Sequence, residues 1–317
     1  MKTESFAALE NALCSRVVGQ TKLVERLLIA LLADGHLLVE GAPGLAKTTV
    51  IKEMAKRVEG SFHRIQFTPD LLPADLTGTD VFLPQEGRFE FQPGPLFHSF
   101  LLADEINRAP AKVQSALLEA MGERQITVGK RTYPLSKYFL VMATQNPIEQ
   151  EGTYALPEAQ LDRFLMHVQI GYPDAHTESE ILRIARDAGR DDRPAEVLVS
   201  EQDIERARAE VAELHLADVL EDYIVEIVQA TRGKSRYGKE AAADIAFGAS
   251  PRGSIALERC ARAKAWLSGR EYVTPEDVQQ VAEDVLRHRV LVTYEAEARG
   301  VTSSALIDRI LQAIPLP

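Results

Sequence analysis

A stretch with the composition of a phosphate-binding loop occupies residues 41–48, GAPGLAKT. An apolar run precedes it at residues 36–40, and a segment that favours a helix follows at 49–58. In such a strand–loop–helix unit, backbone N–H groups and the helix dipole can together hold an anion. The context therefore predicts that this loop binds the phosphates of a nucleotide.

The residues of this loop would have separate tasks. Gly41 and Gly44 would let the backbone turn with its amides pointing inward, because glycine tolerates positive φ. Lys47 is expected to reach the β- and γ-phosphates, and Thr48 to place its hydroxyl on Mg²⁺. The usual pattern has glycine where Ala46 stands, at a position that normally begins the helix and accepts alanine. The alternative is a surface turn with an unrelated Lys-Thr pair.

Two acids follow another apolar run. Residues 99–103 read SFLLA, and Asp104 and Glu105 come next. A carboxylate at the end of a buried strand can hold Mg²⁺ through water, so Asp104 is a predicted metal ligand. Glu105 could activate the attacking water as a general base. A solvated turn is the alternative, and the earlier Lys47-Thr48 pair weakens it.

Three further polar residues suit phosphoryl transfer. Asn146 ends the next apolar run and could position the lytic water, although an asparagine before proline is also a common turn residue. Arg163 could stabilise charge that develops on the phosphates, or could merely pair with Asp162. Arg252 opens a helix, where the dipole disfavours a cation, so a ligand anion would explain it; a solvated arginine is the alternative.

A parallel sheet is the element that could bring these residues together. Strands alternate with helices, which predicts a three-layer α/β domain with right-handed connections. The ends of its strands would then meet at one edge, where ligands bind. The expected strands are residues 36–40, 62–67, 99–105, 138–143 and 164–170. The expected helices between and before them are residues 5–13, 21–33, 49–58 and 110–121.

Two hairpins interrupt this alternation. Alternating residues flank a glycine-bearing turn at residues 81–91, after a short helix within 70–78. The second hairpin is expected at residues 125–134, with its turn at Gly129-Lys130.

The second part of the chain reads as helical. No strand is evident after residue 173, and the sequence therefore predicts an α/β domain at 1–173 followed by a smaller all-α domain at 174–317. Thr177 to Glu180 resembles a capping box. The expected helices are residues 177–188, 201–214, 217–231, 250–267 and 274–288.

Composition narrows the classes of function. The 317 residues carry a net charge of −11, which disfavours general nucleic-acid binding. No apolar run is long enough for a membrane span, and the N-terminus lacks the apolar core of a secretory signal. Cys14 and Cys260 are the two cysteines and suit a reducing cytosol, so a cytoplasmic location is expected. The spacing of the seven histidines argues against a zinc site held by the protein.

Taken together, these motifs resemble the MoxR-type AAA+ ATPases. The resemblance covers nearly the whole chain, and alanine at position 46 is the form that this family uses. The segments that carry it are GAPGLAKT at 41–48, FQPGPLF at 91–97, LADEINR at 102–108, SALLEAM at 115–121, ATQNP at 143–147 and LDRF at 161–164.

The resemblance implies roles for individual residues. Asn146 would be sensor 1, Arg163 an arginine finger that acts on ATP bound by the neighbouring subunit, and Arg252 sensor 2. The all-α domain would be the lid, and the two hairpins would be the helix-2 insert and the pre-sensor hairpin, facing the pore or a client. The residues implied in binding the nucleotide are Val18 for adenine, and Gly41, Ala42, Pro43, Gly44, Leu45, Ala46, Lys47, Thr48 and Thr49.

The resemblance further implies a ring, commonly a hexamer, that uses ATP and Mg²⁺ to remodel, mature or activate a protein complex. Such proteins often work with a partner that carries a von Willebrand factor A domain. Three other functions stay open: a nucleotide-gated assembly module without essential turnover, the motor subunit of a metal chelatase, and a nucleic-acid translocase, against which the acidic charge argues.

Overall fold

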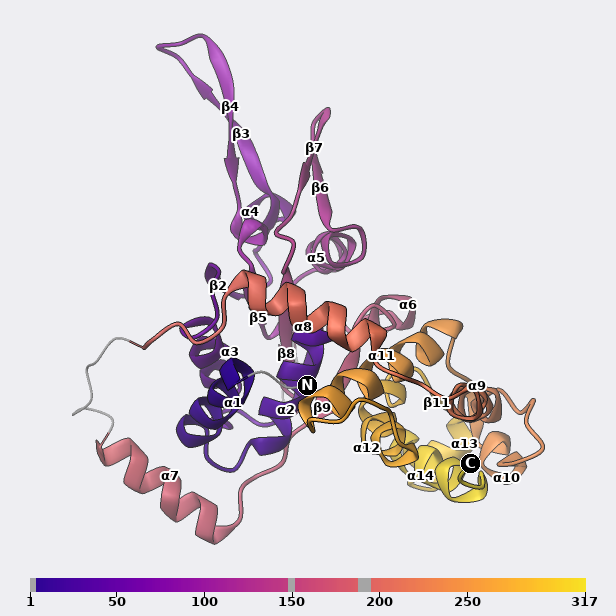
Figure 1. Ribbon diagram of the computed structural model, residues 1–317. Coiled ribbons are helices and arrows are strands. Elements are labelled where there is room, and N and C mark those ends of the chain that lie inside the picture. The colour runs from indigo at the N-terminus through magenta and orange to yellow at the C-terminus, as the bar shows by residue number, and fades with distance from the viewer. Residues whose placement is uncertain (1–3, 148–151, 188–194) are drawn as a thin grey trace.

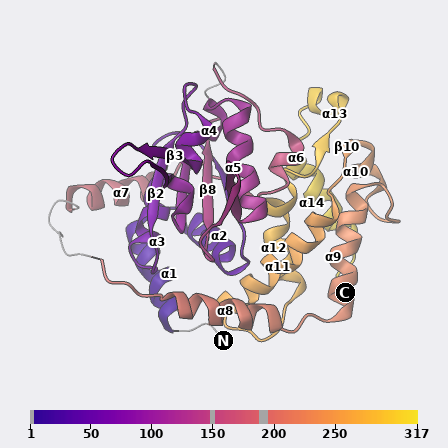
Figure 2. The same cartoon turned by 90° about the horizontal axis from the view of Figure 1, so that it is seen from above.

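The computed structural model describes residues 4–147, 152–187 and 195–317. It consists of an α/β domain, from which two hairpins project, and a helical lid beside it (Figure 1). In both Figure 1 and Figure 2 the lid lies to one side of the sheet. Within the described residues, no helix is both long and apolar enough to cross a membrane.

A five-stranded parallel sheet forms the centre of the α/β domain, in the order β2-β5-β8-β1-β9. It confirms the predicted fold class. Residue Ala143 pairs with Ala103 on one side and Leu38 on the other, so the ends of β5, β8 and β1 meet at one edge. The strands are β1 (Leu37–Glu40), β2 (Phe62–Gln66), β5 (Phe100–Asp104), β8 (Leu140–Gln145) and β9 (Met166–Gln169).

Alternate strand residues build two separate cores, because successive side chains of a strand point to opposite faces. Leu37 and Val39 belong to one core, which packs against the first three helices. Leu38 belongs to the other, with residues of α4 and α5. The helices are α1 (Glu4–Arg16), α2 (Thr21–Leu32), α3 (Lys47–Ala55), α4 (Pro73–Thr77) and α5 (Ala111–Glu123).

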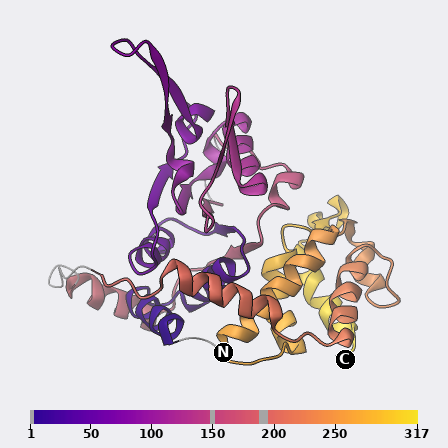
Figure 3. The ribbon, with the colours of Figure 1, turned by 45° about the horizontal axis from the view of Figure 1, so that its top comes forward.

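Two antiparallel hairpins project from the same end of the molecule (Figures 1 and 3). The first consists of β3 (Gly78–Leu83) and β4 (Arg88–Pro93), and the second of β6 (Gln125–Val128) and β7 (Arg131–Pro134). The rings of Phe91 and Tyr133 stack at 4.2 Å between centroids and join the two hairpins. Phe82 and Phe89 on the first hairpin are exposed by 49% and 67%.

Two helices connect the sheet to the lid. They are α7 (Ala175–Asp187) and α8 (Glu201–Glu213), and a short α6 (Glu158–Leu161) precedes them. The Thr177 amide donates to Asp174 Oδ1 at 2.8 Å, so α7 begins earlier than expected and the predicted capping box at Thr177 is wrong. Helix α8 contacts both α2 and the lid helix α11 (Pro251–Leu267), and the domain boundary at residue 173 stays a prediction.

The lid consists mainly of helices. They are α9 (Asp218–Thr231), α10 (Lys239–Ala243), α11 (Pro251–Leu267), α12 (Pro275–Leu286), α13 (Tyr294–Ala298) and α14 (Ser303–Ala313). The expectation of no strand after residue 173 is wrong, because β10 (Ile245–Phe247) pairs with β11 (Leu291–Val292). Such short strands contain too few residues to show a periodic pattern.

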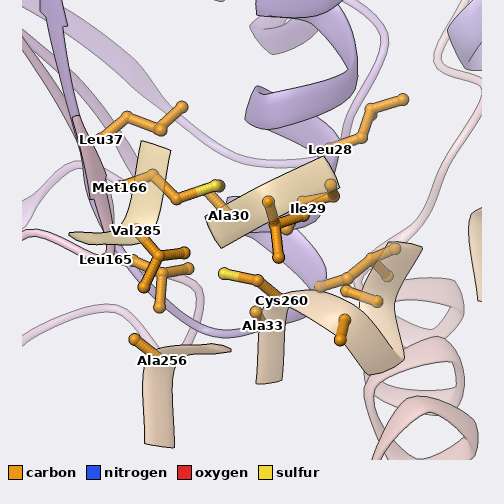
Figure 4. Packing of buried hydrophobic residues seen from close by; sticks show 14 of the residues in the cluster. Leu28, Ile29, Ala30, Ala33, Leu37, Leu165, Met166, Ala256, Cys260 and Val285 are labelled. Carbon is orange, nitrogen blue, oxygen red and sulfur yellow. The ribbon is translucent and has the colours of Figure 1, made fainter. Parts of the chain in front are cut away.

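The lid and the α/β domain share one apolar core. Figure 4 shows Cys260 of α11 and Val285 of α12 beside Ile29 of α2 and Met166 of β9, all members of one buried cluster. The buried carboxylate of Asp284 adds an ionic contact across the same boundary. It accepts from Arg26 Nε at 2.8 Å and lies 3.0 Å from Lys22 Nζ.

A buried histidine of the α/β domain, His36, contacts residues of β8 and α5. His36 Nδ1 accepts from the Val141 amide at 3.1 Å, and Nε2 lies 3.3 Å from the Met121 carbonyl oxygen. This arrangement suits the neutral ring with its proton on Nε2. Burial, with a further contribution from the Arg124 charge, lowers the pKa of His36 to about 4.

We expect His36 to destabilise the fold as the pH falls from its ordinary pKa of 6.5 towards 4. The unfolded chain takes up a proton in that range and the folded chain does not, so the free energy of unfolding falls with pH, by up to about 3 kcal/mol. Above pH 6.5 this contribution is constant. Denaturant unfolding at several pH values should show a shallower slope in His36→Gln than in the wild type. His176→Gln, at an exposed histidine, should keep the wild-type slope, and equal slopes in all three would refute the assignment.

Candidate active site

The loop at residues 41–48 joins β1 to α3 at the edge where the sheet strands end. Gly44 has a φ of 85°, as expected for a turn that points amides inward. Gly41 has a different role, because a Cβ there would lie 2.5 Å from the Ile170 side chain and 2.9 Å from its carbonyl oxygen. Close packing, rather than positive φ, therefore requires glycine at position 41.

Ala46 departs from the expected start of the helix. Helix α3 begins at Lys47, and Ala46 precedes it with a φ of 58° and a ψ of 15°. Left-handed backbone of this kind costs a residue with a Cβ about 1–2 kcal/mol. The alanine is therefore held in a strained conformation that glycine would adopt freely, which corrects the expectation that position 46 begins the helix and accepts alanine.

Lys47 places its ammonium group over the edge of the sheet. Its Nζ donates to the Gly41 carbonyl oxygen and, at 3.4 Å, to the Gln145 carbonyl oxygen. Burial lowers the pKa of Lys47, and the charges of Asp104 and Glu105 oppose that shift. A half-buried ammonium beside two carboxylates is well placed to bind phosphate oxygens, which would replace the carbonyl contacts.

The two acids lie where β5 ends, and both are held by hydrogen bonds. Asp104 Oδ1 accepts from the Thr144 hydroxyl at 2.6 Å, and its Oδ2 accepts from Arg64 Nη2 at 2.6 Å. Glu105 has a φ of 56°, and its amide donates to the same threonine hydroxyl at 3.0 Å. Glu105 Oε2 accepts from Gln66 Nε2 at 2.7 Å and from Arg108 Nη1 at 3.0 Å.

Three residues that hold the two acids were not predicted from the sequence: Arg64, Gln66 and Thr144. Arg64 and Gln66 belong to β2, which pairs with β5 so that Gln66 lies opposite Asp104. Side chains two residues apart on a strand point to the same face, so both can reach the acids. The missing information was the order of the strands, because the sequence did not place β2 beside β5. Thr144 follows the expected strand at residues 138–143 and was not predicted to be a site residue, whereas the structure places it within β8.

A cavity of about 310 Å³ gathers most of the predicted site residues. It joins the phosphate loop to the ends of β5 and β8. Its lining consists of Pro43, Gly44, Leu45, Ala46, Lys47, Thr48, Thr49, Asp104, Glu105, Thr144 and Asn146. The structure therefore brings together the loop, the two acids and Asn146.

The residues of this cavity fit a nucleotide with Mg²⁺. Thr48 and Asp104 offer hard oxygen donors beside the amides of the loop. Within the described residues, no group of three or more His, Cys, Asp or Glu side chains could hold a metal ion. Two protein oxygens combined with phosphate oxygens are the usual environment of Mg²⁺, which binds few protein ligands.

An apolar pocket of about 410 Å³ adjoins the phosphate loop. Val18 lies in it, as the adenine-binding prediction requires, and the pocket shares Pro43 and Thr49 with the phosphate cavity. Ile181 and Ile184 of α7 also line the pocket, together with Tyr172. The sequence did not indicate this contribution from α7.

Arg163 and Arg252 lie elsewhere. Both line a third pocket, of about 300 Å³, which has no lining residue in common with the phosphate cavity. Arg163 Nη1 donates to the Leu118 carbonyl oxygen. Asp162 lies between the two arginines in the chain's fold and contacts the lid instead of pairing with Arg163. The predicted site residues thus form two groups on one chain.

Comparisons with known proteins agree with this layout. Residues 36–166 match the ATPase family associated with various cellular activities (AAA), and residues 239–310 match the AAA lid domain. The chain is 48% identical to Chaperone MoxR1 of Mycobacterium tuberculosis, over 95% of this chain and 79% of that protein. It is 34% identical to Protein MoxR of Paracoccus denitrificans, over 98% and 96% of the two chains.

A solved structure has the same fold throughout. The chain superposes on a crystal structure from Cytophaga hutchinsonii with a TM-score of 0.92 and 47% identity, covering 99% of this chain and 95% of that one. The predicted family resemblance is confirmed over nearly the full length. The chain belongs to the MoxR family of AAA ATPases.

Proposed function

We propose that this chain hydrolyses ATP with Mg²⁺ in a ring of identical subunits, commonly a hexamer in this family. The ring would use the energy to remodel a protein client. The observation that carries the proposal is the single cavity lined by Lys47, Thr48, Asp104, Glu105 and Asn146. It combines groups for binding phosphate, holding a metal, activating water and positioning it.

Each side chain would have one task in the reaction. Lys47 binds phosphate oxygens, and Thr48 and Asp104 hold the metal, which when bound offsets negative charge on the phosphates. Glu105 accepts the proton of the attacking water, and Asn146 orients that water through its amide. The apolar pocket lined by Val18 and Ile181 would take the adenine.

The position of Arg163 and Arg252 supports a shared site. They line a pocket separate from the phosphate cavity of their own chain. In a ring, that pocket could face the phosphate loop of the next subunit, so each site would be completed by two chains. The AAA ATPases are often oligomeric.

We further propose that the hairpin bearing Phe82 and Phe89 contacts the client. The two rings lie 5.1 Å apart and are exposed, which suits binding to apolar segments. A partner with a von Willebrand factor A domain is proposed from the family resemblance. Two cysteines in 317 residues suit a cytoplasmic location.

A nucleotide-gated assembly module is the second candidate. The hydrogen bonds that Glu105 accepts from Gln66 and Arg108 favour it. Through Gln66, a change in the position of Glu105 on nucleotide binding could be transmitted to β2 without hydrolysis. A chelatase-like motor subunit has the same ATPase core and would differ in its partner. Net charge of −11 argues against a nucleic-acid translocase.

Steady-state ATPase activity against protein concentration, with Mg²⁺ present and mass measured alongside, tests the shared site. Specific activity should rise as the ring assembles. Activity that is independent of assembly would contradict sites shared between chains. Absence of activity in assembled rings that bind ATP would favour the gated module.

Lys47→Ala should weaken ATP binding by at least about tenfold, because it removes a charged phosphate ligand worth about 1.5–3 kcal/mol. A fluorescent nucleotide titration measures this directly. Lys52→Ala, at an exposed lysine five residues further along α3, is the matched control and should bind normally. Unchanged binding and turnover in Lys47→Ala would mean that the phosphate loop is misassigned.

A further inference from the structure

Asp162 connects the segment that carries Arg163 to the lid. Its Oδ1 accepts from Arg289 Nε at 2.8 Å, and its backbone carbonyl oxygen accepts from Arg289 Nη2 at 3.2 Å. Its Oδ2 accepts from the Ser250 hydroxyl at 3.0 Å and lies 3.8 Å from Arg252 Nη1. One carboxylate thus contacts three lid side chains.

The contact with Ser250 fixes the start of α11. The Ser250 hydroxyl also accepts from the Arg252 amide at 3.2 Å, so it caps the helix while it donates to Asp162. The positive end of the helix dipole disfavours a cation at Arg252 and favours a nearby carboxylate. Asp162 therefore offsets the unfavourable position of Arg252.

Arg289 fixes the other side of this link. It is almost fully buried, and its guanidinium donates to the Leu165 carbonyl oxygen at 3.1 Å and to the Phe164 carbonyl oxygen at 2.7 Å. Residues 162–165 are therefore held against the end of α12. The segment that carries Arg163 cannot shift relative to the lid without breaking these buried hydrogen bonds.

Arg163 keeps its charge available. Within residues 4–147, 152–187 and 195–317 it forms no ion pair with a carboxylate, and its Nη1 donates to the Leu118 carbonyl oxygen. Its guanidinium lies over Gly122, where a Cβ would come within 3.4 Å of Nη1. Arg252 on the other side of Asp162 is 62% exposed.

We propose that Asp162 is a positioning residue that sets Arg163 and Arg252 as a pair for the nucleotide of the neighbouring subunit. This inference rests on the proposed shared-site hydrolysis. Asp162 itself touches no nucleotide. It acts through the two arginines, by fixing the spacing between a residue of the α/β domain and a residue of the lid.

The alternative is that Asp162 only stabilises the docking of the lid. The two roles differ in which subunit of the ring loses ATPase activity when Asp162 is replaced. A structural defect impairs the chain that carries it, whereas a positioning defect impairs the ATP site of the next subunit. Mixed rings separate the two.

Asp162→Asn removes the charge and keeps the size of the side chain. We expect kcat to fall at least about tenfold, since small misplacements of catalytic groups cost up to about a hundredfold. ATP affinity and ring assembly should stay unchanged, because the chain's own phosphate cavity is intact. Asp162→Glu, which keeps the charge, should recover part of kcat, and Asp308→Asn, at an exposed aspartate, should behave as the wild type.

Mixing Asp162→Asn with Lys47→Ala should restore turnover, because the second chain supplies correctly positioned arginines to the intact phosphate loop of the first. In an Arg252→Ala background, Asp162→Asn should cost less than in the wild type, since coupled residues are not additive. Ser250→Ala, which leaves the Arg289 contact in place, should show a smaller defect with the same recovery and serves if Asp162→Asn does not fold.

Normal kcat in both Asp162→Asn and Ser250→Ala would overturn the proposal. So would a defect that Lys47→Ala chains do not rescue while they do rescue Arg163→Ala, because that pattern identifies a structural role. If Arg163→Ala is not rescued either, the shared site itself is wrong and the inference falls with it.

Discussion

Glu105→Gln is expected to bind ATP normally and to hydrolyse it about 10²–10⁴-fold more slowly, the range that a positioned general base contributes. Glutamine has the same shape and can keep contacts with Gln66 and Arg108, but it cannot accept the proton of the attacking water. Single-turnover hydrolysis, measured beside a binding titration, separates the two effects. Glu213→Gln, at an exposed glutamate at the end of α8, is the control.

The same variant distinguishes the motor from the gated module. If client maturation stops while ATP stays bound, turnover drives the work. If maturation continues with trapped ATP, binding alone sets the output and the remodelling proposal is wrong. Normal hydrolysis in Glu105→Gln would instead show that another group serves as the base.

Arg163→Ala should retain ATP binding and lose hydrolysis by about 10³-fold or more, since an arginine that meets the transferring phosphoryl group contributes about 10³–10⁵. Its own phosphate cavity has no residue in common with the pocket of Arg163, so binding should be unaffected. ATPase activity and nucleotide affinity, measured on assembled rings, test both halves. Arg206→Ala, at an exposed arginine of α8, should be active.

Mixed rings test whether Arg163 acts on the neighbouring site. Equal amounts of Arg163→Ala and Lys47→Ala chains make about a quarter of the junctions complete, because each junction needs an intact lysine on one side and an intact arginine on the other. Activity should therefore reappear although neither variant is active alone. Assembled mixed rings without activity would place the arginine's target within its own chain.

Much of the fold could be predicted from the sequence. Strands β1, β5 and β8 of the central sheet begin as continuous apolar runs, as expected for strands buried on both faces. Asp104 and Asn146 were predicted to share one edge because they follow such runs, and the structure places both in the phosphate cavity. The apolar run and the polar residue after it were sufficient for this prediction, since both lie within one short segment.

Other features depend on contacts between distant residues. The order of the strands places Arg64 and Gln66 beside the acids, and nothing in β2 itself indicates this neighbour. Ala46 was expected to begin the helix, because helix propensity gives no information on the left-handed backbone that the loop imposes at this position. The lid pocket with Asp162 forms only when α11 and α12 dock against residues far away in the chain.

The apolar cluster that crosses from α2 and β9 into α11 and α12 has a consequence for motion and folding. Separating the lid from the α/β domain would expose Cys260 and Val285 to water. It would also remove Asp284 from Arg26 and Lys22, so the two domains should unfold in one cooperative transition. Each chain would then move as a rigid body during the proposed cycle of ATP binding and hydrolysis. In the proposed ring, movements would then occur between chains, where the arginines of one subunit would meet the nucleotide of the next.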